Sequence, residues 1–168
     1  MNIAGILGQR GVYNGPVYML EFALVADGLA KDKLYPLDVD RAFKRLDKIK
    51  KLAVWWSQMS KPWPLLKSGE IVVTPWVRSI SYMLSGEPIG ISYEGAALTF
   101  EGWVVPKGTK NAANAMKFIN FALLRKNQAE LTKYIAYGPT HADAMPFVDQ
   151  KVQPHLSSNR LMRPKAFC

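Results

Sequence analysis

The chain has 168 residues, 49% of them hydrophobic and 21% charged, which suits one ordinary globular domain with a sizeable core. No apolar run approaches the roughly 20 residues that cross a bilayer, so the composition excludes a membrane-spanning helix. Its 22 basic and 13 acidic residues give a net charge of +9, a balance typical of proteins that bind nucleic acid, anionic lipid or an acidic partner. A single cysteine, Cys168, excludes an internal disulfide.

Two helices are predicted near the start of the chain. Gly15 and Pro16 open an apolar helix that ends at Gly28, where glycine supplies a stop. Asp38 begins the second helix, because carboxylates favour the positive end of the helix dipole. Its apolar side chains recur at helical spacing and predict a buried face: Val39, Phe43, Leu46 and Ile49.

Strands and helices alternate through the rest of the chain. Residues 53–56 read as a short buried strand, 62–68 as a short helix or loop, and 69–74 as a turn leading into a strand. The later expectations, in chain order, are a helix over 76–84, a strand over 88–93, a long extended run over 97–105, a helical region over 112–135 that breaks near Lys126 and Asn127, and an irregular, loosely packed tail beyond Pro154. This alternation predicts an α/β architecture with helices covering a sheet.

The sequence contains few combinations of residues that are typical of catalytic or metal sites. His141 and Asp143 lie two residues apart, but such a pair in a turn is more often ordinary surface chemistry than a catalytic site. There is no metal-ligand spacing and no glycine-rich phosphate loop, so we expect no catalytic residue, no metal and no cofactor. The basic cluster at 41–51 reads as the solvated face of a helix, which argues against nucleic acid. The alternative is a basic interaction module that uses residues 44–51 to bind nucleic acid or an acidic protein.

Aromatic residues beside isolated carboxylates suggest a site for an organic ammonium ion. Aromatic faces attract a cation by about 0.5 to 2 kcal/mol each, and a carboxylate adds charge-assisted hydrogen bonds. The residues with these properties are Trp76, Glu101, Trp103 and Tyr137.

Several collinear phrases carry a family resemblance. They are Gln9-Arg10-Gly11, Tyr35-Pro36-Leu37-Asp38-Val39-Asp40-Arg41-Ala42-Phe43, Val54-Trp55-Trp56, Val104-Val105-Pro106-Lys107-Gly108 and Tyr134-Ile135-Ala136-Tyr137-Gly138-Pro139. The chain resembles the periplasmic spermidine/putrescine-binding proteins of ABC transporters, which are about twice as long and have two α/β lobes. The resemblance implies a partial periplasmic-binding-protein type II fold that lacks the start of the first lobe. It assigns 1–99 to the second lobe, 100–140 to a hinge strand and helices returning toward the first lobe, and 141–168 to a C-terminal segment.

The same resemblance implies ligand-binding residues. Glu101 falls where the family places an acidic residue facing a ligand amine, Tyr137 matches an aromatic contact, and Trp76 resembles a stacking wall of the cleft. Thr99 stands where spermidine-preferring members carry an aromatic residue, and the neighbourhood of Tyr18 replaces the acidic contacts expected at the start of the first helix.

The implied function is that of the substrate-binding component of an ABC importer. It captures a polyamine, putrescine or spermidine, or a similar small organic cation, and presents it to a membrane permease. The implied location is the periplasm, although residues 1–11 lack the pattern of a secretory signal. Without the first lobe, apolar sheet edges and helix faces are left uncovered, so we expect the chain to self-associate or to pair with the missing lobe.

Overall fold

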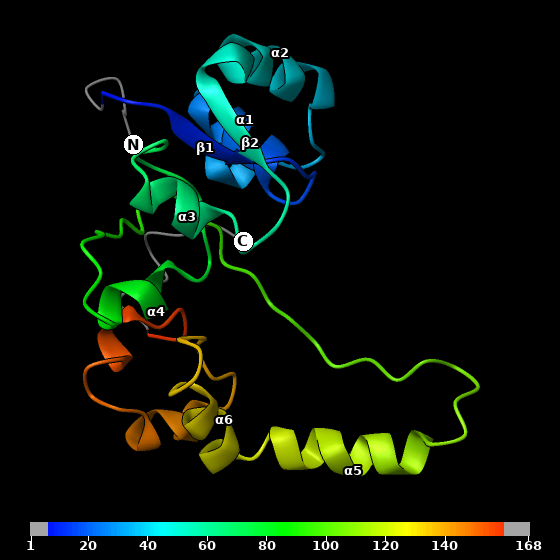
Figure 1. Ribbon diagram of the computed structural model, residues 1–168. Helices are drawn as coiled ribbons and strands as arrows, with labels where there is room; N and C mark the ends of the chain where they lie inside the picture. The colour runs from blue at the N-terminus through cyan, green and yellow to red at the C-terminus, as the bar shows by residue number, and fades with distance from the viewer. Residues whose placement is uncertain (1–6, 160–168) are drawn as a thin grey trace. The chain divides into compact units, whose positions relative to one another are not determined.

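The computed structural model of the chain describes residues 7–159 (Figure 1). It divides into two compact units, Met1–Val77 and Arg78–Cys168, called here the first and second units. Within the described residues, no helix combines the length and the apolar character needed to cross a bilayer.

The first unit is built on two parallel strands, β1 (Arg10–Tyr13) and β2 (Ala53–Trp56). Residue pairs run from Arg10 opposite Ala53 to Tyr13 opposite Trp56. The predicted strand at 69–74 is reduced to one bridge, in which Val73 pairs with Arg10 and accepts a 2.8 Å hydrogen bond from the Gly11 amide. The first unit therefore contains the α/β pairing that the sequence predicted.

Two helices that pack on each other join the strands of the first unit (Figure 1). The first, α1 (Met19–Ala26), starts three residues later than predicted and is followed by Gly28 at a φ of 87°, which only glycine adopts easily. The second, α2 (Val39–Ile49), begins as predicted: the Asp38 side chain accepts from the Arg41 amide at 3.0 Å.

The predicted buried face of α2 is partly wrong. Val39 and Phe43 are about half exposed, and the one buried residue of the helix is Ala42. The small Ala42 side chain permits close packing against α1, where Leu24 is fully buried. Arg41 adds an ion pair to Asp27 at 2.7 Å between Nε and Oδ2. Contact therefore runs along the Ala42 side of α2, not along Val39 and Phe43.

In the second unit, two predicted strands do not form. Residues 88–93 and 97–105 contain no ladder, and Phe100 and Val104 are 75% and 85% exposed. A strand requires a neighbour along its length to accept and donate its backbone hydrogen bonds, and within these two ranges only Ala97 takes part in a bridge. These segments are extended chain without a sheet.

The helices of the second unit are shorter than the sequence suggested. They are α4 (Ser79–Leu84), α5 (Ala112–Ala122) and α6 (Arg125–Leu131), while α3 (Pro62–Lys67) belongs to the first unit and matches its prediction. The break after α5 falls at Leu123 and Leu124, before the predicted position, because the Asn127 side chain donates back to the Phe121 carbonyl at 2.7 Å and caps the helix.

The core of the second unit gathers around its C-terminal turns. The 3₁₀ helix Ala142–Phe147 packs with α6, and a second 3₁₀ helix follows at Gln153–His155. The buried side chains of this core are Ala129, Ala136, Ala144, Val148 and Leu156. Leu156 is fully buried, so the predicted loose packing beyond Pro154 is wrong at this residue. Residues 160–168, the rest of that predicted tail, lie outside the described residues.

Candidate functional site

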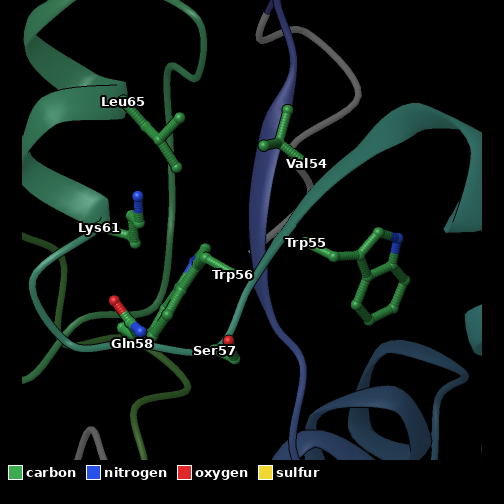
Figure 2. A pocket seen from close by; sticks show the side chains of 7 residues that line it. All are labelled: Val54, Trp55, Trp56, Ser57, Gln58, Lys61 and Leu65. Carbon is green, nitrogen blue, oxygen red and sulfur yellow. The ribbon is translucent and has the colours of Figure 1, made fainter.

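A hollow of about 320 Å³ lies in the first unit, where β2 ends. Ligands of open α/β sheets characteristically bind beyond the carboxyl ends of parallel strands. Figure 2 shows the hollow, with Trp56 directed toward Gln58 and Trp55 on the opposite side of the strand, as strand alternation requires. The lining residues are Val54, Trp55, Trp56, Ser57, Gln58, Lys61 and Leu65.

Trp76, the predicted stacking wall, touches the segment that follows β2. Its indole Nε1 donates to the Met59 carbonyl at 3.1 Å, and the side chain is half-buried. Trp56 is buried, its ring centroid lies 5.1 Å from that of Tyr13, and its Nε1 donates to Thr74 Oγ1 at 2.9 Å. These contacts fix the backbone around the hollow.

Tyr18 precedes α1 with a left-handed φ of 63°, an uncommon conformation for a residue with a side chain. Its hydroxyl lies within electrostatic range of Tyr35. The Tyr35 hydroxyl donates to the Glu21 carboxylate at 2.8 Å, and this hydrogen bond raises the pKa of Tyr35 above its ordinary value. Tyr18 therefore lies at the start of α1, the helix whose Glu21 side chain accepts the hydrogen bond from Tyr35.

In the second unit, Tyr137 lies among charged groups. Burial raises the pKa of the Tyr137 hydroxyl, the Glu101 carboxylate raises it further, and the Arg78 guanidinium opposes both. Both charged side chains are exposed, while Tyr137 is half-buried. The charges of Glu101 and Arg78 therefore both act on the Tyr137 hydroxyl, and Arg78 is a residue that the sequence analysis did not single out. Thr99 is exposed, two residues before Glu101.

Hydrogen bonds hold the turn that carries Tyr137. The Ala136 amide donates to Ser81 Oγ of α4 at 3.2 Å, which ties the turn to the helix that Arg78 precedes. On the other side, Gln128 Oε1 accepts from the Thr140 and His141 amides at 2.8 and 3.1 Å. These bonds anchor the backbone on both sides of the Tyr137 ring.

Glycine is required at position 138 because Ser157 and Ser158 pack closely against its backbone. A Cβ there would lie 2.6 Å from both Ser157 Oγ and the Ser158 backbone nitrogen, a distance that real Cβ atoms do not reach. The turn after Tyr137 therefore packs directly on the segment that follows Leu156.

His141 has a structural role in the described structure. Its Nδ1 accepts from the Asp143 amide at 3.2 Å and caps the 3₁₀ helix Ala142–Phe147. Within residues 7–159, no group of three or more His, Cys, Asp or Glu side chains is arranged to hold a metal ion.

Comparisons with known proteins assign the family and the fold. Residues 3–156 match the family described as bacterial extracellular solute-binding protein. The chain belongs to this family. The crystal structure of the periplasmic binding protein AgtB from A. tumefaciens R10, in complex with agropinic acid, is 40% identical and superposes with a TM-score of 0.83 over 95% of this chain and 51% of that one. The fold is therefore a partial periplasmic-binding-protein fold, as the sequence predicted.

Two curated relatives come from Pseudomonas aeruginosa. The gamma-aminobutyric acid-binding protein is 35% identical over 162 residues, which is 92% of this chain and 46% of the relative. The putrescine/cadaverine-binding protein is 38% identical over 60 residues, which is 36% of this chain and 17% of the relative. The chain spans about half the length of the first of these relatives. Both are binding proteins rather than enzymes, in agreement with the sequence prediction.

Proposed function

We propose that this chain forms part of the substrate-binding component of an ABC importer and that it recognises the protonated amine of a small ligand. The observation that supports the proposal is that the negative charge of Glu101 raises the pKa of the half-buried Tyr137. A carboxylate gives an ammonium group charge-assisted hydrogen bonds, and an aromatic face adds cation–π attraction.

The polyamine predicted from the sequence is the first ligand class, with putrescine as its simplest member. The putrescine/cadaverine-binding relative supports it, and the contacts predicted for this ligand include Trp76, Tyr18 and Thr99. On this proposal the complete protein works in the periplasm, closes around its ligand and presents it to the membrane permease.

A second ligand class, an amino acid with separated amine and carboxylate groups, is favoured by Arg78. Its guanidinium acts on the same hydroxyl as Glu101, so the neighbourhood of Tyr137 carries both signs of charge. Guanidinium groups bind carboxylates in a planar fork, which suits a zwitterion better than a dication. The relatives that bind gamma-aminobutyric acid and agropinic acid support this class.

Tryptophan fluorescence of the purified chain, titrated with putrescine, spermidine and gamma-aminobutyrate, tests the proposal. Glu101→Gln keeps the shape of the side chain and removes its charge, so we expect it to weaken amine binding at least tenfold, about 1.4 kcal/mol. Glu94→Gln, an exposed change in the same unit, is the matched control and leaves binding unchanged. Equal affinities of the wild type and Glu101→Gln would reject the amine site.

A further inference from the structure

The hollow at the end of β2 is lined by three polar side chains that have no partner among the described residues. Ser57, Gln58 and Lys61 are exposed, and their side chains make no hydrogen bond or ion pair within residues 7–159. Figure 2 shows Gln58 and Lys61 on the side of β2 that Trp56 faces. Hydroxyl, amide and ammonium groups all donate hydrogen bonds, so this wall of the hollow is rich in donors.

The charge of Lys61 is not compensated locally. No acidic residue lines the hollow. Several carboxylates of the first unit are engaged elsewhere: Glu21 with Tyr35, Asp27 with Arg41, Asp38 with the α2 amide, and Asp47 with Lys50. The net charge of +9 adds a field that attracts anions. A polyamine would therefore be repelled from this hollow, whereas an anionic group would be attracted.

The loop that carries these donors is held in place before any ligand arrives. The Asn14 amide donates to the Trp56 carbonyl at 2.7 Å, and the Lys61 amide donates to the Gln58 carbonyl at 2.9 Å. The indole of Trp76 holds the Met59 carbonyl between them. Donors on a fixed backbone lose less entropy on binding, which favours affinity for a small ligand.

We propose that this hollow is a carboxylate subsite, in which Lys61 supplies the charge and Ser57 and Gln58 donate hydrogen bonds. The inference goes beyond the proposed function, because the hollow lies wholly in the first unit and its donors do not belong to the amine site. Arg78, in the second unit, is an alternative binding position for a carboxylate probe, and mutation distinguishes the two positions.

Amide chemical shifts of the full ¹⁵N-labelled chain test the subsite residue by residue. The probes are butyrate, which has only the carboxylate, putrescine, which has only amines, and gamma-aminobutyrate, which has both. We expect butyrate and gamma-aminobutyrate, at up to tens of millimolar, to shift the amides of Ser57, Gln58 and Lys61 saturably, and putrescine to leave them in place. Lys61→Gln should weaken butyrate binding at least tenfold, whereas Lys61→Arg should retain it within about threefold.

The controls distinguish this inference from the proposed function. Lys44→Gln removes one exposed charge from α2, outside the hollow, and should leave the butyrate shifts unchanged. The subsite is rejected if butyrate does not move these amides, if putrescine moves them equally, or if Arg78→Gln rather than Lys61→Gln abolishes butyrate binding. The amine site is judged separately, from the effect of Glu101→Gln on the shifts that putrescine causes around Tyr137. Butyrate binding does not depend on that site.

Discussion

The two units differ in how completely they cover their apolar side chains. In the first unit, α1 packs on α2, and its Met19, Ala23 and Leu24 side chains are buried. In the second unit, α5 has no buried residue at all, and Phe118 and Phe121 are more than half exposed. The helices of the first unit thus bury apolar side chains in a core. Residues 98–124 of the second unit instead carry exposed apolar side chains that no other residue within 78–159 covers.

The largest expected effect compares one side chain from each surface. Leu24→Ala removes a fully buried side chain and should cost about 2 to 5 kcal/mol of the free energy of unfolding of the first unit. Phe118→Ala on α5 removes an exposed ring that makes an edge contact with Trp103, with ring centroids 5.2 Å apart, and should cost about 1 kcal/mol or less. Urea unfolding followed by circular dichroism measures both. Equal losses would show that α5 is covered in solution.

The uncovered surface of α5 predicts self-association. Phe118→Gln combined with Phe121→Gln should raise the dissociation constant for self-association at least tenfold, because it removes apolar area without changing charge. Light scattering over a concentration series measures the effect. Leu52→Gln, at a side chain of the first unit that is 60% exposed, is the control and should leave association unchanged. A monodisperse wild-type monomer that melts cooperatively would contradict the prediction.

The smallest effect concerns acid stability of the first unit. The Arg41 side chain donates to Asp27 and lowers the pKa of that carboxyl below its ordinary value of 3.8. The pair therefore stabilises the folded state above about pH 4, and this contribution is lost as the pH falls through the lowered pKa. Asp27→Asn should lower stability slightly at pH 7 and flatten its decrease in acid, measured by thermal melting between pH 7 and pH 3. Asp32→Asn, which has no such partner, is the control; an unchanged acid profile in Asp27→Asn would reject the pair's contribution.

Local signals predicted much of the first unit. The Asp38 cap and the strand at Ala53–Trp56 depend on residues close in sequence and were predicted correctly, and the helix at Pro62–Lys67 is one of the two alternatives predicted for that segment. The strands expected at 88–93 and 97–105 were wrong, because extended chain becomes a strand only beside a neighbour, and sequence pattern does not supply one. The break expected at Asn127 was misplaced because that residue caps α5 from within α6.

The candidate site was predicted where a motif names a residue. Tyr137 and Glu101 came from phrases of the family resemblance, and their roles in ligand binding stay predictions. Arg78 and Lys61 were missed because isolated basic residues are ordinary surface residues in a sequence with 22 of them. Arg78 is distinguished only by its effect on the Tyr137 hydroxyl, and Lys61 only by its position in the lining of the hollow.

The Gln128 side chain connects three segments of the second unit. Its Oε1 accepts from both the Thr140 and His141 amides, while its Nε2 donates to the Leu123 carbonyl at 3.1 Å at the end of α5. The turn after Tyr137 and the joint between α5 and α6 therefore cannot open independently without losing the same bonds. In hydrogen exchange, the Thr140 and His141 amides should therefore open together with the joint between α5 and α6. A partner that binds α5 and stabilises this joint should slow the exchange of both amides.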